Sequence, residues 1–135
     1  MQRIKTALVT GSTSGIGLAI ATELASRGMN IMLNGFGDST DIEALRSGLA
    51  LAHGVDVLYD DADMSRQEAI EAMLARVAKQ FGRIDVLVNN AGIQHVAPVD
   101  EFPVDKWNAI LAINLTAAFH TTRLALPHMK SNGWG

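Results

Sequence analysis

The 135-residue chain contains no cysteine, only three prolines and a single tyrosine. Without cysteine it can form no disulfide, no thiolate metal site and no cysteine nucleophile. Its uninterrupted apolar runs are short, which argues against a membrane span and a signal peptide. Basic residues are outnumbered, 11 against 14 acidic residues, and the net charge of −3 argues against nucleic-acid binding through phosphate neutralisation. The four histidines are not spaced as metal ligands, so we expect no metal site. Taken together, these absences predict a cytoplasmic protein with no nucleic-acid or membrane partner.

What the chain does contain is a regular alternation of two hydrophobic patterns. Short apolar runs are typical of strands buried on both faces, and the stretches between them carry apolar residues at helical spacing. Strands are expected at 5–10, 31–33, 55–59 and 84–88, and helices at 15–27, 41–51, 66–81 and 103–126. This order predicts a single α/β domain over residues 1–135, a doubly wound parallel sheet of the Rossmann type.

Local residues predict further details of these helices. The packed face of the first helix should consist of Ile16, Ala19, Ile20 and Leu24. Ser65–Glu68 matches a capping box and should begin the third helix, and Pro127 should end or kink the fourth. Asn114 shares an apolar face of the fourth helix with Trp107, Ile110, Leu111, Leu115, Ala118, Phe119 and Thr122. A buried amide in that position would need a partner, either in a neighbouring loop or in a functional site.

The turn between the first strand and the first helix, Thr10–Gly17, is rich in glycine. Gly11 permits a tight turn, Gly15 lets the backbone approach a pyrophosphate, and Gly17 lets the helix pack closely on the strand. The free N–H groups and the positive end of the helix dipole would then face the phosphates. No lysine follows the last glycine, which disfavours a P-loop. The turn therefore predicts a dinucleotide site.

Together with three further motifs, this turn resembles that of the short-chain dehydrogenase/reductase family. In chain order the motifs are Thr10-Gly11-x-x-x-Gly15-Ile16-Gly17, Asp63, Asn89-Asn90-Ala91-Gly92 and Asn114. The resemblance covers essentially all 135 residues and implies a sheet with strand order 3-2-1-4. Within the family, the chain is most similar to the bacterial D-3-hydroxybutyrate dehydrogenases, through Asn34–Gly37, Asn90–His95 and Phe102–Asn108.

The resemblance implies a role for each matching residue. Phe36 would lie beside the adenosine ribose, Asp63 with Met64 would hold the adenine, and Gln94 would help to bind a substrate carboxylate. Asn114 would be the catalytic asparagine, whose helix backbone helps to hold a proton-relay water. The implied cofactor-binding residues are Gly11, Thr13, Ser14, Gly15, Ile16, Gly17, Phe36, Asp63, Met64, Asn90 and Gly92. Of the adjacent Asn89 and Asn90, we expect one to be structural and one to line the site.

The chain also departs from the family pattern. The family's catalytic Ser and Tyr-x-x-x-Lys are absent, and Tyr59, the only tyrosine, has no lysine four residues later. The sequence therefore matches the N-terminal part of a longer dehydrogenase, truncated before the fifth strand, and we expect the 135-residue chain alone to be inactive. At full length it would act on a small hydroxy acid as a homo-oligomer. The alternatives are a non-catalytic dinucleotide-binding module and an interaction fragment.

The expected cofactor is NAD rather than NADP. An acidic residue often ends the second strand of NAD sites, and Asn34 stands there instead. However, residues 12–14 and 34–41 contain no lysine or arginine to bind a 2′-phosphate, and Asp38 and Asp41 would repel one.

Overall fold

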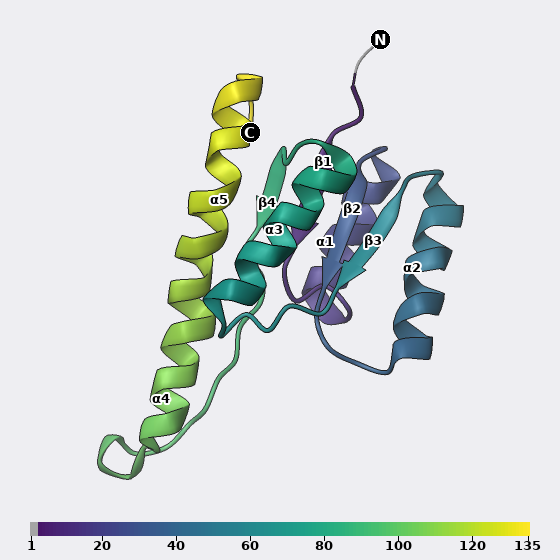
Figure 1. Cartoon of the computed structure of the whole chain (residues 1–135). Helices are drawn as coiled ribbons and strands as arrows, with labels where there is room; N and C mark the ends of the chain where they lie inside the picture. The colour runs from purple at the N-terminus through teal and green to yellow at the C-terminus, as the bar shows by residue number, and fades with distance from the viewer. Residues whose placement is uncertain (1–2) are drawn as a thin grey trace.

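The computed structural model describes residues 3–135 and confirms the alternation of strands and helices. The strands are β1 (Thr6–Val9), β2 (Asn30–Asn34), β3 (Val57–Asp60) and β4 (Val86–Val88). The helices are α1 (Gly15–Ser26), α2 (Ser39–His53), α3 (Gln67–Phe81), α4 (Val104–Leu111) and α5 (Ala117–Asn132), with a 3₁₀ turn at Val99–Glu101 and a π-helical turn at Ala112–Thr116. All strand pairs are parallel and the order is β3-β2-β1-β4, as the family resemblance implied (Figure 1).

The sheet separates two apolar layers because successive strand residues point to opposite faces. Leu8 pairs in register with Met32, and both pack with residues of α3 and α5. Their neighbours Ala7 and Ile31 also pair, and pack on the other face with α1 and α2. Figure 1 shows α3 in front of the sheet and α1 behind it. Both faces are covered, which explains why the strands read as continuous apolar runs.

The packed face of α1 differs from the predicted one. Its buried residues are Gly17, Ala21 and Ala25, whereas Ile16 is 76% exposed. These three small residues recur at a spacing of four and bring the helix backbone close to β1 and β2. Close approach, rather than the largest side chains, therefore decided which face of α1 is buried.

The capping box predicted at Ser65–Glu68 does not form. The helix α3 begins at Gln67, and its N-cap residue Arg66 makes no side-chain cap. Ser65 is instead engaged by Asp63, whose Oδ1 accepts both the Ser65 hydroxyl (2.7 Å) and the Ser65 N–H (2.9 Å). A carboxylate is a strong acceptor, so this local turn takes the hydroxyl that the cap would have used.

The elements α4, the π-helical turn and α5 form one continuous helix from Val104 to Asn132. Of the two effects predicted for Pro127, ending or kinking the helix, the first is wrong: Pro127 lies inside α5, and Gly133, with φ of 68°, ends the helix. Pro127 and Arg123, whose carbonyl loses its partner, are both exposed, so water can satisfy that carbonyl. By length and apolar content (mean hydropathy 1.3) this helix could also cross a membrane, a test that core helices of globular proteins pass too.

The long helix does not pack through its predicted apolar face, because none of Trp107, Ile110, Leu111, Leu115, Ala118, Phe119 and Thr122 is buried. Ala117, Thr121 and Ala125 are its buried residues, and α5 packs along α3 and β4. By contrast Trp107 is 58% exposed and Phe119 is 62% exposed. In the described part of the chain, no element covers these two side chains.

Candidate functional site

The glycine-rich turn opens the site at the carboxyl ends of the strands, on the lower side of the sheet in Figure 1. Gly15 has φ of +58°, and a Cβ there would meet nothing within 4 Å. The space above this backbone is therefore open, as the approach of a pyrophosphate requires. A Cβ at Gly17 would instead overlap the Gly11 carbonyl oxygen, so close packing of helix on turn requires glycine there.

Asn90 shapes this turn from the neighbouring strand end. Its Nδ2 donates to the carbonyls of Thr10 (3.1 Å) and Gly11 (2.9 Å), while the Thr10 hydroxyl accepts the N–H groups of Asn90 and Ala91. The amide of Asn90 is thus committed to backbone 80 residues away in sequence. We therefore assign Asn90 the task of fixing the turn rather than facing a ligand.

The expectation that one of the two asparagines lines the site stays a prediction, because a small hollow of about 60 Å³ beside Met64 and Asn114 is lined by Asn89. Asn89 also makes structural hydrogen bonds. Its Oδ1 accepts the hydroxyl of buried Thr121 (2.6 Å), and its Nδ2 donates to Thr122 (3.4 Å). These bonds join the end of β4 to α5. Together, the two asparagines fix the glycine turn and the long helix relative to the same strand.

Asn34, at the end of β2, is fully buried, and its side chain is engaged in hydrogen bonds between strand ends. Its Oδ1 accepts the Gly11 N–H (3.1 Å), and its Nδ2 donates to the carbonyls of Asp60 (3.2 Å) and Ala62 (3.1 Å). Aspartate could not replace it here, because a carboxylate cannot donate to two carbonyls. Asn34 links three strand ends, and this role explains why no acidic residue stands at this position.

A hollow of about 280 Å³ lies where the strands end, and we call it the strand-end hollow. It brings together seven of the implied cofactor residues: Gly11, Thr13, Ser14, Phe36, Asp63, Met64 and Gly92. Gly15, Ile16, Gly17, Asn90 and Gln94 do not line it. The sequence interpretation missed Asn34, Gly35, Ala62, Ala91, Ile93 and Ile113. Asn34 and Gly35 end or directly follow β2, and Ala62, Ala91 and Ile93 lie within five residues of the end of β3 or β4, so their place after a parallel strand was the available signal.

Asp63 is the one titratable residue that lines the strand-end hollow. The two hydrogen bonds from Ser65, the hydroxyl first, lower the pKa of its carboxyl despite partial burial. Both bonds go to Oδ1, which leaves Oδ2 as an acceptor. Asp63 is therefore ionised at neutral pH and can accept a hydrogen bond, but it is a poor proton donor.

Asn114 lies in the π-helical turn, where the N–H of Ala117 donates to the carbonyl of Ala112, five residues earlier. Its side chain is exposed rather than buried, and it makes two bonds with Ile93: Oδ1 accepts the N–H (2.9 Å) and Nδ2 donates to the carbonyl (2.8 Å). Asn114 thus fixes the segment after β4 on the long helix. These bonds use one of the two amide hydrogens and one of the two oxygen lone pairs, so the amide keeps one donor and one acceptor. π-Turns are frequent at functional sites.

A second hollow, of about 350 Å³, adjoins the first and shares Thr13, Ser14 and Phe36 with it. Asp38 and Asp41 line it and no lysine or arginine does, so we call it the acidic hollow. The Asp38 carboxylate accepts the Asp41 N–H (3.0 Å) and caps α2. The sequence had drawn attention to both aspartates, and the structure places them together.

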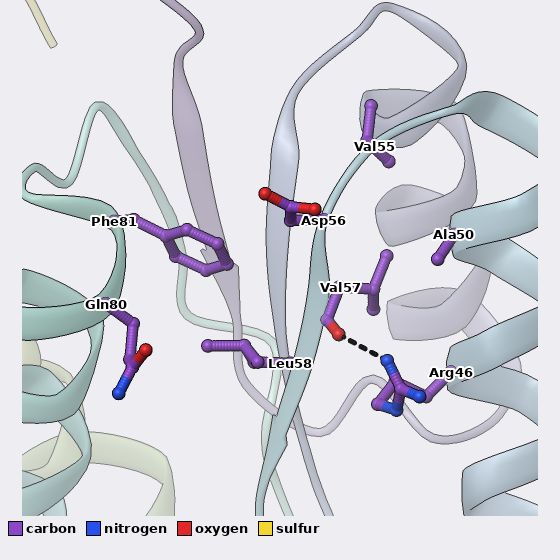
Figure 2. A pocket seen from close by; sticks show the side chains of 8 residues that line it. All are labelled: Arg46, Ala50, Val55, Asp56, Val57, Leu58, Gln80 and Phe81. Carbon is purple, nitrogen blue, oxygen red and sulfur yellow. Dashed lines mark hydrogen bonds between the residues drawn. The ribbon is translucent and has the colours of Figure 1, made fainter.

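A third hollow, of about 330 Å³, lies on the edge of β3 and contains none of the motif residues. Figure 2 shows Arg46 reaching from α2 to the Val57 carbonyl (2.9 Å), with Gln80 and Phe81 on the opposite side. Arg46 also pairs with Glu43, so its charge is already matched. Among residues 3–135, no group of three His, Asp or Glu side chains is placed to hold a metal ion.

Comparison with known proteins agrees with this geometry. The family model of the short chain dehydrogenases matches residues 5–135. The D-beta-hydroxybutyrate dehydrogenases of Cupriavidus necator and Rhizobium meliloti are 58% and 51% identical over 97% of this chain, and the chain spans about half of each (50% and 51%). The L-sorbose reductase of Gluconobacter frateurii, solved with NADPH and L-sorbose, superimposes with a TM-score of 0.90 at 34% identity. That superposition covers 96% of this chain and 49% of the reductase.

Proposed function

Because the chain belongs to the short chain dehydrogenase family, a family of oxidoreductases that bind a nicotinamide dinucleotide, we propose that it binds NAD and serves the interconversion of 3-hydroxybutyrate and acetoacetate. The observation that carries the proposal is the strand-end hollow, which collects Gly11, Asp63 and Gly92 from the ends of three strands. Ligands bind at this edge of doubly wound sheets. The identity to two D-beta-hydroxybutyrate dehydrogenases supports the substrate class.

The chemistry of the residues at this edge suits a dinucleotide. The open backbone at Gly15 and the start of α1 would hold the pyrophosphate, with Ser14 as an additional donor. Asp63 would accept a hydrogen bond from adenine through its free Oδ2, and Met64 beside it is buried and apolar. When bound, the nicotinamide ring of NAD supplies the site that accepts or gives the hydride.

Charge around the ribose end favours NAD over NADP. The acidic hollow adjoins Thr13, Ser14 and Phe36, and a 2′-phosphate entering it would meet the carboxylates of Asp38 and Asp41. No guanidinium or ammonium lines either hollow to offset that repulsion. The structural relative solved with NADPH shows that the fold accepts the 2′-phosphate in other sequences, so the preference must come from these residues.

The chain's own residues orient the reactants but do not complete the proton transfer. Asn114 fixes Ile93 on the long helix, and Gln94, the next residue, would bind the substrate carboxylate. Neither candidate acid fits the reaction: Asp63 is held ionised, and the Tyr59 hydroxyl donates to the Gly35 carbonyl. The proton must therefore come from a residue outside these 135, which also makes a non-catalytic dinucleotide-binding module the second candidate.

Calorimetric titration of the chain tests the cofactor part of the proposal. NAD should bind more tightly than NADP, and the reverse order would contradict it. To test the reaction, residues 1–135 can be joined to the remaining half of the Cupriavidus necator relative. This chimera should reduce NAD with 3-hydroxybutyrate. If it binds NAD but gives no turnover with any small hydroxy acid, the module is the better description.

A further inference from the structure

The loop between β2 and α2, Gly35–Gly37, is tied down through its carbonyl oxygens. The Gly35 carbonyl accepts the hydroxyl of Tyr59, which comes from β3. The next carbonyl, of Phe36, accepts the hydroxyl of Thr13 (3.1 Å), which comes from the glycine-rich turn. Two hydroxyls from two separate elements thus hold two successive peptide groups, although the Phe36 side chain is exposed.

This loop is also a boundary. Phe36 and Thr13 are among the residues common to the strand-end hollow and the acidic hollow. Gly35 lines only the strand-end hollow, while Gly37 and Asp38 line only the acidic one. The hydrogen bond between Thr13 and Phe36 therefore lies on the wall that separates the two spaces.

The wall leaves no room for a side chain that could bind the ribose directly. A Cβ on Gly35 would lie 2.6 Å from the Thr13 hydroxyl oxygen, and Gly35 has φ of +153°. Asn34, the preceding residue, is buried and fully hydrogen-bonded. A carboxylate at either position would meet the Thr13 side chain or break the Asn34 hydrogen bonds. The way in which the loop backbone is held can therefore contribute to cofactor choice beside the charges of Asp38 and Asp41.

We propose that Thr13 and Tyr59 determine cofactor specificity as positioning residues: their hydroxyls clamp the Gly35–Phe36 backbone and keep the adenosine ribose out of the acidic hollow. The inference rests on the proposed binding of NAD in the strand-end hollow. A closed wall fits a ribose with a free 2′-hydroxyl, whereas the additional phosphate of NADP would have to displace the loop or enter a space lined by Asp38 and Asp41.

Tyr59 is well suited to act as a permanent donor. Burial, followed by the nearby charges of Asp61 and Asp60, raises the pKa of its phenol. The hydroxyl therefore keeps its proton throughout the neutral range and can donate to the Gly35 carbonyl. Thr13 carries no ionisable group, so neither half of the clamp is lost near neutral pH.

The test compares Thr13→Val and Tyr59→Phe, which remove one hydroxyl each with little change in shape, with Thr13→Ser, which keeps the hydroxyl. Thr22→Val is the matched control, because the Thr22 hydroxyl bonds the Leu18 carbonyl within α1 (2.8 Å). Dissociation constants are measured by calorimetry for NAD, NADP, AMP and nicotinamide mononucleotide. Circular dichroism melting confirms that each variant is folded.

Loss of either hydroxyl should raise the dissociation constants of NAD and AMP by about threefold to tenfold, which is the effect of one hydrogen bond. The affinity for nicotinamide mononucleotide should not change. The affinity for NADP should fall less than the affinity for NAD, so the ratio of the two dissociation constants moves closer to one. Thr13→Ser and Thr22→Val should resemble the unchanged chain. The proposal is contradicted if NAD and NADP lose the same affinity, or if nicotinamide mononucleotide loses as much affinity as NAD. It is also contradicted if Thr13→Ser binds NAD as weakly as Thr13→Val does. If the unchanged chain binds neither NAD nor AMP, the proposed function itself fails.

Discussion

The two edges of the sheet are built differently. At β3, Arg46 from α2 donates to the Val57 carbonyl (2.9 Å) and Arg76 from α3 donates to the Tyr59 carbonyl (2.6 Å). Each guanidinium also pairs with an acid, Glu43 or Asp60. At β4, on the other edge, residues 86–88 pair only with β1, and no described arginine or lysine side chain bonds their carbonyls.

This difference distinguishes an edge that is protected from one that can still pair. Charged side chains on outward carbonyls prevent a foreign strand from adding to β3. The β4 edge has apolar residues instead. Helices α4 and α5 lie on the β4 side of the molecule (Figure 1), and both carry exposed apolar residues. The protected edge adjoins α2, and the open edge adjoins the long helix.

The largest expected effect is association of the 135-residue chain through the β4 side. Light scattering should show oligomers or aggregates. 3-Hydroxybutyrate should not reduce NAD above background, because the chain lacks the family's Ser and Tyr-x-x-x-Lys, which would take the proton from the substrate hydroxyl. The double variant Phe119→Lys/Leu126→Lys, on α5, should reduce association. Leu51→Lys is the control, since Leu51 is also apolar and exposed but lies on α2 near the protected edge. A monodisperse chain that reduces NAD would contradict this picture of the two edges.

The next largest effect is expected from removing the buried carboxylate of Asp85, which anchors the start of β4. Asp85 accepts the Thr6 N–H (2.8 Å) and pairs with Arg83, and its side chain is fully buried. Asp85→Ala would leave both donors without their partner and should lower the free energy of unfolding by about 3 kcal/mol. Urea unfolding in the Phe119→Lys/Leu126→Lys background measures this change in the free energy of unfolding. As the control, Asp61→Ala at the exposed end of β3 should change the free energy of unfolding little. If Asp61→Ala and Asp85→Ala lower it equally, Asp85 is not the anchor.

Asn114→Ala tests the segment that follows the open edge. In the chimera with the Cupriavidus necator half, turnover should fall by about tenfold or more, while NAD affinity stays nearly constant. The reason is that Asn114 fixes Ile93 and the π-helical turn without touching the glycine-rich turn. Asn108→Ala, an exposed asparagine on α4, is the control. If Asn114→Ala simply unfolds, its amide is structural and the catalytic interpretation is wrong.

The smallest effect is expected at the protected edge itself. Arg46→Gln combined with Arg76→Gln would remove both charges from the β3 edge and weaken the bonds to the Val57 and Tyr59 carbonyls. Stability should change less than with Asp85→Ala, because these ion pairs are partly exposed. Sedimentation in the Phe119→Lys/Leu126→Lys background should show new concentration-dependent association. Arg66→Gln is the control, since Arg66 pairs with Glu68 and bonds no strand; the same association there would rule out edge protection.

Much of the fold and part of the site could be predicted from the sequence. The order of strands and helices and the glycine-rich turn were visible because each depends on residues close together in the chain, and the family resemblance pointed to Asp63. Seven implied cofactor residues do line the strand-end hollow. The predictions that failed concern Ile16, Ser65 and Pro127, where tertiary packing or a competing hydrogen bond overrode the local rule.

By itself, then, the sequence determined the alternating elements and the chemistry of the turn, because periodicity and turn preferences act over a few residues. Only the tertiary structure decided that Asn34 and Asn90 serve the turn and that Asn114 holds Ile93. It also decided that one sheet edge is protected. These outcomes depend on hydrogen bonds between residues about 10 to 80 positions apart, whose partners no local pattern specifies and which form only when the strands are aligned.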